Sequence, residues 1–148
     1  MKIRAAIPQD SDAISLLAYE SKAHWNYSEA FLQACKADLT VSAEFIKKNP
    51  VYVVEDNCEL LAFYGFCVRE QKLDTLFIRP TYIGHGLGKL LWAHILETAK
   101  HQGMIEFTLD ADPHAEGFYQ KMGATTIGRI ASSVDPQRLL PLMKVIVP

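Results

Sequence analysis

The 148-residue sequence has no apolar run close to the roughly 20 residues that span a bilayer, and its polar beginning is unlike a signal peptide. It has only three cysteines and no Cys-x-x-Cys pair, so neither a disulfide framework nor a zinc knuckle is indicated. It also lacks a basic excess, because its net charge is −2, and this argues against nucleic-acid binding. We therefore expect a cytoplasmic protein that binds neither membrane nor nucleic acid.

The sequence also has no internal repeat, low-complexity tract or flexible linker. Hydrophobic residues make up 49% and charged residues 22%, the balance of an ordinary globular protein. The histidines show no metal-binding spacing. We expect a single domain over residues 1–148 without a metal, present as a monomer or a homodimer.

Apolar periodicity changes along the chain from helical to strand-like and back. Helices are predicted to start at Asp10 or Ser11, one of which would cap the first helix, at Ser28, at Ser42, and again near 87 and 115. Strands are predicted over 2–6, 51–55, 60–68, 73–78, 105–109 and 142–147. This order is α/β with a mixed sheet rather than regular βαβ alternation.

The most informative segment is Ile83-Gly-His-Gly-Leu-Gly-Lys89, between a predicted strand and an amphipathic helix. Glycines allow backbone amides to converge on an anion at a helix N-terminus, so the segment suggests a phosphate cradle. A turn that requires positive φ angles is the alternative. A dinucleotide fingerprint would need glycine at Lys89, and a P-loop would need Ser or Thr at Leu90, so both are excluded.

Two motifs resemble the GCN5-related N-acetyltransferase (GNAT) family. Residues 73–91 resemble its acetyl-CoA-binding pattern Gln/Arg-x-x-Gly-x-Gly/Ala, with Gly86 and Gly88 as the glycines and Ile83 in place of Gln or Arg. Residues 112–124 look like the signature Asn-x-x-Ala-x-x-Phe-Tyr-x-x-x-Gly-Phe, with Asp112 and Ala124 as departures. The resemblance implies a mixed, mostly antiparallel sheet flanked by helices.

The resemblance also implies the cofactor and its site. Acetyl-CoA would lie between strands 73–78 and 105–109, and an amine would attack it directly in a ternary complex. Ile83 would remove a possible charge contact with phosphate but not the amide cradle. The implied cofactor-binding residues are Phe77, Ile78, Ile83, Gly84, His85, Gly86, Leu87, Gly88, Lys89, Asp112 and Tyr119.

Two residues match catalytic positions of the family. Tyr119 corresponds to the tyrosine that protonates the departing thiolate, although a core aromatic is its alternative role. Asp74 lies where many members carry a glutamate base, and it is otherwise a strand-end carboxylate. Glu106, Asp110 or water are the other candidates for the base.

The acceptor is an amine that the sequence does not identify. His24, Trp25 and Tyr27 suit the wall of an acceptor site, or a plug between helices, and Arg138 would meet an acidic substrate group or be solvated. The leading hypothesis is an acetyl-CoA-dependent N-acetyltransferase acting on a small molecule or peptide. A non-catalytic acyl-CoA sensor and a transferase of another acyl chain are the alternatives.

Overall fold

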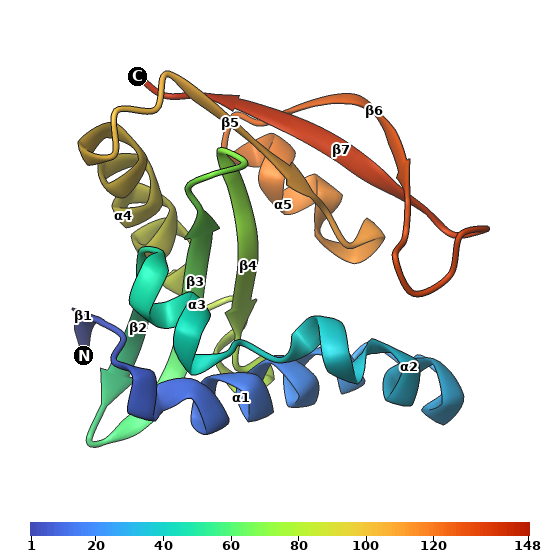
Figure 1. The fold of residues 1–148 in the computed structure, drawn as a ribbon, viewed down its shortest axis with the longest axis horizontal. Helices are drawn as coiled ribbons and strands as arrows, with labels where there is room; N and C mark the ends of the chain where they lie inside the picture. Colours follow the sequence, from blue (N-terminus) through green and yellow to red (C-terminus); the bar gives the residue numbers. More distant parts are fainter. The chain divides into compact units, whose positions relative to one another are not determined.

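The computed structural model describes residues 1–148 and contains a seven-stranded sheet in the order β1-β2-β3-β4-β5-β7-β6 (Figure 1). Strands β4 and β5 pair in parallel, whereas β1–β2, β2–β3, β5–β7 and β6–β7 pair antiparallel. The predicted α/β class with a mostly antiparallel sheet is therefore confirmed. No helix of the protein has the length and hydropathy needed to cross a membrane.

The strands are β1 Lys2–Ala5, β2 Val51–Asp56, β3 Glu59–Cys67, β4 Lys72–Ile78, β5 Glu106–Asp110, β6 Thr125–Ala131 and β7 Leu139–Ile146. The α-helices are α1 Ser11–Ala23, α2 Glu29–Leu39, α3 Ala43–Lys48, α4 Leu87–His101 and α5 Glu116–Lys121. Short 3-10 turns are η1 Pro8–Asp10, η2 Pro80–Tyr82 and η3 Pro113–Ala115.

The chain forms two compact units, which are described separately. Unit 1 comprises Met1–Phe66 and Thr75–Gly88, and unit 2 comprises Cys67–Asp74 and Lys89–Pro148. Strand β4 and helix α4 contribute residues to both units. The expectation of a single domain over the whole chain stays a prediction.

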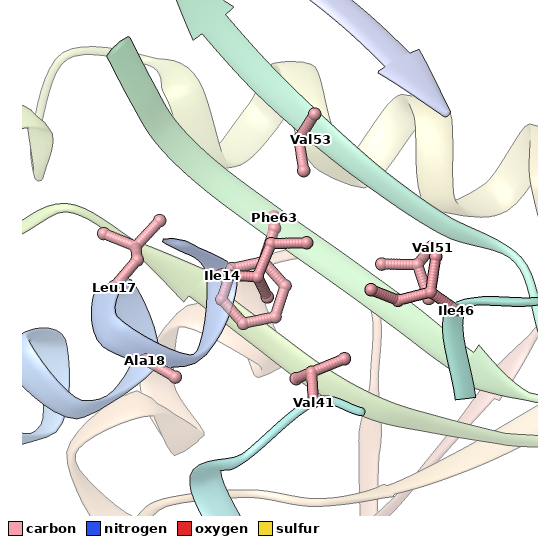
Figure 2. Close-up of a cluster of buried hydrophobic side chains, with 8 residues drawn as sticks. All are labelled: Ile14, Leu17, Ala18, Val41, Ile46, Val51, Val53 and Phe63. Atoms are coloured by element: carbon pink, nitrogen blue, oxygen red, sulfur yellow. The ribbon is translucent and has the colours of Figure 1, made fainter. Parts of the chain in front are cut away.

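The core of unit 1 packs helices α1 and α3 against strands β2 and β3 (Figure 2). Ile14, Leu17 and Ala18 form the buried stripe of α1, and Val53 and Phe63 lie opposite them without solvent exposure. Burying each large apolar side chain contributes about 1.5–3 kcal/mol. The other members of the cluster are Val41, Ile46 and Val51.

Serine side chains cap α2 and α3 of unit 1, whereas the predicted cap of α1 is absent, because Asp10 accepts from the Ile7 amide and pairs with Arg4 instead. The Ser28 hydroxyl accepts a hydrogen bond from the Phe31 amide at 3.1 Å, and Ser42 accepts one from the Phe45 amide at 3.0 Å. Each bond satisfies an amide that the first helical turn leaves without a partner. The prediction of α2 and α3 from these serines is confirmed to within one residue.

Unit 2 contains a strand that sequence periodicity does not indicate. Strand β6, with the sequence TTIGRIA, is mostly exposed, and its register with β7 shifts between Thr126 and Gly128. Figure 1 shows β6 beside β7, with α5 close to this hairpin. Strand β7 begins at Leu139, three residues before its predicted start, and includes Pro141, whose carbonyl accepts from the Ala111 amide at 2.9 Å. Gly128 lies in β6, the edge strand of the sheet, where glycine is tolerated better than in a central strand, whereas β7 with Pro141 lies between β5 and β6.

Candidate active site

The glycine loop follows β4 through the η2 turn in unit 1. Its chain folds on itself through two weak hydrogen bonds, from the Ile83 amide to the Pro80 carbonyl and from the His85 amide to the Tyr82 carbonyl, both 3.3 Å. Gly84 and Gly86 have φ angles of +86° and +80°, and no atom lies within 4 Å of a Cβ built on either. Both glycines therefore have a backbone conformation that residues with a Cβ rarely adopt, and both face open space that a ligand can approach.

The amide cradle stays a prediction, and two amides of the loop already have hydrogen-bond partners. The amides of Ile83 and His85 are already hydrogen-bonded within the loop. The donors that can turn to an anion are therefore the amides of Gly84 and Gly86 and those of the first turn of α4. Ile83 itself is 45% exposed, so its substitution for Gln or Arg leaves an apolar side chain on the surface of the loop.

Arg79 anchors the start of the loop, a role that the sequence analysis missed. Its Nε and Nη2 atoms donate to the Leu60 carbonyl at 3.0 and 2.8 Å, and its amide donates to the Leu61 carbonyl at 2.7 Å. These three bonds tie the end of β4 to β3. The signal in the sequence was the Arg-Pro pair that closes the strand.

The end of β4 places two predicted cofactor contacts in the same unit as the loop. Phe77 and Ile78 are half-buried. The Phe77 ring lies 5.9 Å from the Phe63 ring, and the Ile78 carbonyl accepts from the buried Ser21 hydroxyl at 3.3 Å. The strand end is thus held by packing on one side and by a hydrogen bond from α1.

Tyr119 lies on the short helix α5 of unit 2 and is only 8% exposed. Its ring centroid lies 5.4 Å from that of Phe118 and 5.9 Å from that of Trp92. Burial, and next the negative charge of Asp112, raise the pKa of Tyr119 above the ordinary value for a phenol. The phenol is therefore protonated at neutral pH and can act as a proton donor.

Asp112 and Arg138 contact each other. Asp112 caps η3, where its Oδ1 atom accepts from the His114 amide at 2.9 Å, and its Oδ2 atom lies 3.5 Å from Nη2 of Arg138. Arg138 lies in the loop before β7, as predicted, but its side chain is 20% exposed and not simply solvated. Asp112 and Arg138, predicted as cofactor and substrate contacts, thus form an internal ion pair.

The three candidate bases differ in their surroundings. Asp110 Oδ2 lies 2.6 Å from Lys72 Nζ, and Glu106 lies 3.8 Å from Lys144. Burial is the largest single effect and lowers the pKa of Lys72, but the hydrogen bond to Asp110 and the negative charges of Asp110, Asp74 and Glu70 together raise it. The carboxylate of Asp110 is therefore held in an ion pair with the Lys72 ammonium. Asp74 is exposed on β4.

The segment between α1 and α2 presents the predicted acceptor residues on the surface of unit 1. Trp25 is 39% exposed, and the His24 ring meets it edge-on at 5.1 Å. The Tyr27 ring packs on Phe31 at 4.8 Å, and Lys22 Nζ lies 4.9 Å from the Tyr27 centroid. His24 and Trp25 therefore line an open surface, whereas Tyr27 is held against its own helices.

Comparison with known proteins identifies similar chains. The family model for the acetyltransferase (GNAT) domain matches residues 12–133. Peptidyl-lysine N-acetyltransferase YjaB of Salmonella typhimurium is 34% identical over 108 residues, which cover 72% of this chain and 70% of that protein. The 5-NmdU N-acetyltransferase of Pseudomonas phage PaMx11 is 26% identical over 132 residues, covering 85% and 88%.

A solved structure shares the fold along the whole chain. The PaiA N-acetyltransferase from Thermoplasma acidophilum, crystallised in complex with coenzyme A, superposes with a TM-score of 0.75 and covers 98% of each chain. Its sequence identity is 19%, so this likeness concerns the fold.

Proposed function

The chain belongs to the acetyltransferase (GNAT) family, and on that premise we propose that it transfers the acetyl group of acetyl-CoA directly to an amine in a ternary complex. The observation that carries this proposal is the glycine loop. Gly84 and Gly86 hold positive φ angles in open space immediately before helix α4. This is the backbone form that an anionic pyrophosphate requires of its binding loop.

The proposed cofactor contacts follow the backbone. Amides of Gly84 and Gly86, with those of Leu87, Gly88 and Lys89, would bind the pyrophosphate, and the backbone of Phe77 and Ile78 would hydrogen-bond the pantetheine arm. The resemblance of residues 73–91 to the family motif supports both assignments. Because the contacts are made by the main chain, the loss of the Gln or Arg side chain at Ile83 leaves them available.

Tyr119 is the proposed general acid. Its raised pKa keeps the phenol protonated, and a protonated phenol can donate to the sulfur as the thioester bond breaks. A free thiol has a pKa near 8.5 in water, but the same loss of solvent that raises the pKa of Tyr119 also makes a buried thiolate more basic. Proton transfer between the two groups therefore stays within reach.

Asp74 is the proposed base for the acceptor. An alkylammonium group has a pKa of about 10.4, so nearly all of the acceptor carries an extra proton at neutral pH. The support for Asp74 is its place in the segment that resembles the family motif, where many members carry a glutamate base. Its charge acts on Lys72, the lysine that also pairs with Asp110. Asp74 is exposed and can accept the proton directly or through one water molecule.

The acceptor is proposed to be an amine of a peptide or a small molecule. The two relatives are named for different acceptors, a peptidyl lysine and 5-NmdU, so the family match leaves the acceptor open. The exposed His24 and Trp25 side chains are the proposed contacts for it.

The test is a thiol-release assay with acetyl-CoA and a panel of amines that includes a lysine peptide and a polyamine. We expect release of one coenzyme A thiol for each acetylated amine, confirmed by the mass of the product. Saturable binding of acetyl-CoA with no release on any amine would instead indicate a non-catalytic sensor. Longer acyl-CoA donors, assayed in parallel, determine the preferred acyl chain.

A further inference from the structure

A buried hydrogen-bond donor without a partner lies beside Tyr119. Trp92, on helix α4, is 5% exposed, and its indole Nε1 is the one fully buried side-chain nitrogen or oxygen of the protein without a hydrogen-bond partner. A buried donor left unsatisfied in this way destabilises the folded protein. Such a group calls for a reason other than the stability of the fold.

The rings around Trp92 suggest that reason. Its ring centroid lies 5.9 Å from that of Tyr119, tilted by 58°, and 6.4 Å from that of Phe118, at 89°. Phe107 of β5 packs on it at 6.2 Å. Phe118 also meets Tyr119 directly at 5.4 Å. We call these four residues, all in unit 2, the aromatic cluster.

The indole of Trp92 is large enough to fill the space beside Tyr119, which a smaller side chain would leave open. A phenylalanine at position 92 would remove the unsatisfied N–H but would leave space beside Tyr119. Tilted and edge-to-face ring pairs at these distances stabilise the fold beyond the area they bury, and they prefer particular ring orientations. The indole therefore packs against Tyr119 while its own N–H stays without a partner.

We infer that Trp92 is a positioning residue for the acetyl-transfer reaction: its ring, with that of Phe118, fixes the orientation of Tyr119 and keeps water away from it. The inference rests on the proposed role of Tyr119 as general acid. Proton donation requires the phenol oxygen within hydrogen-bond reach of the accepting atom. A displacement of about 1 Å can reduce the rate about 100-fold.

The experiment is a double-mutant cycle with Trp92→Phe, Tyr119→Phe and the combined variant, measuring kcat, the KM for acetyl-CoA and thermal stability. We expect Trp92→Phe to lower kcat about tenfold or more and to change KM for acetyl-CoA less than about twofold. In the Tyr119→Phe background the same change should have no further effect on kcat, because the group it positions is gone.

Two further variants separate positioning from folding. Benzothienylalanine at position 92 keeps the two-ring shape and removes only the N–H, so it should retain kcat and unfold at the same or a higher temperature. Ile95→Val, at a fully buried position on the same helix, should lower the unfolding temperature and leave kcat unchanged. If Trp92→Phe does not fold, Trp92→Met replaces it with a side chain that fills irregular gaps.

The outcomes distinguish the proposed role of Tyr119 as acid from the role of Trp92. An unchanged kcat in Tyr119→Phe overturns the proposed acid and this inference together. If Tyr119→Phe lowers kcat but Trp92→Phe does not, or if the two effects multiply in the combined variant, only the role of Trp92 is overturned. Loss of kcat with benzothienylalanine would also overturn it.

Discussion

The Arg138 guanidinium lies 3.5 Å from the Asp112 carboxylate, joining the loop before β7 to the turn that leads into α5. Neither side chain is more than 22% exposed. Asp112 is the charged group whose field raises the pKa of Tyr119, after the larger effect of burial. Arg138 therefore pairs with the carboxylate whose charge acts on the proposed acid, and its contact with the substrate stays a prediction.

Arg138→Gln is expected to lower kcat by up to about fivefold, since a partly exposed ion pair is worth about 0–1 kcal/mol. The uncompensated Asp112 carboxylate would raise the pKa of Tyr119 further and make it a weaker acid. Asp112→Asn keeps the hydrogen bond from His114 and removes the charge, so adding it to Arg138→Gln should restore kcat. If only the KM for the acceptor rises, the result would instead indicate that Arg138 binds the substrate.

Gly86→Ala tests the phosphate loop through thermal shift. Coenzyme A at 100 times its Kd should stabilise the wild-type protein by about 2.7 kcal/mol, a readily measured rise in Tm, whereas NAD and ATP should do much less. A Cβ at φ +80° strains the loop and obstructs the approach of phosphate, so Gly86→Ala, and more strongly Gly86→Val, should lose most of the rise.

Gly103→Ala is the matched control for backbone strain. Gly103 follows α4 with φ +76° and also has open space around a built Cβ. The Gly103→Ala variant should lower the Tm of the free protein about as much as Gly86→Ala does, and it should keep the full rise in Tm with coenzyme A. If Gly86→Val keeps the full rise in Tm with coenzyme A, the glycine loop does not bind the cofactor.

The raised pKa of Tyr119 leads us to expect a specific pH dependence of kcat. The buried phenol has a pKa above its ordinary value, so the protonated, donating form persists through about pH 10. We expect kcat to show no fall from tyrosine ionisation below that pH, and Tyr119→Phe to lower kcat about 10²–10⁴-fold with little change in acetyl-CoA binding. A wild-type kcat in Tyr119→Phe would leave Tyr119 as a core aromatic residue.

Asp74→Asn separates base catalysis from selection of the neutral amine. With Asp74 as base, kcat/KM should rise with pH and level off at the pKa of that carboxylate. Asp74→Asn, which is nearly isosteric, should lower this plateau and leave a rate that climbs toward the pKa of the amine. Profiles of wild type and variant that coincide within about twofold would assign the proton to Glu106, Asp110 or water.

Local rules account for what was predicted correctly. Ser28 and Ser42 satisfy amides three residues ahead, so their helices were predicted to within one residue. Gly84 and Gly86 adopt positive φ, as a glycine-rich loop before a helix indicates. The spacing of Ala115, Tyr119 and Gly123 carried the resemblance, and the family match confirms it.

Interactions with distant residues account for what was missed. Strand β6 is held by pairing with β7, and its exposed, irregular sequence has no clear alternation. Arg138 and Lys72 each meet an aspartate, Asp112 and Asp110, more than twenty residues away in the chain. A charge in a sequence predicts that a side chain is polar, but it does not predict its partner.

By itself the sequence determined the family, the glycine loop and the elements other than β6, because apolar periodicity, positive-φ glycines and motif spacing act over a few neighbouring residues. Only the tertiary structure decided which charges pair and which rings surround Tyr119. Those relationships depend on side chains brought together from separate elements, such as Trp92 of α4 and Tyr119 of α5. The environment of the proposed acid is therefore a property of the fold rather than of the motif that contains it.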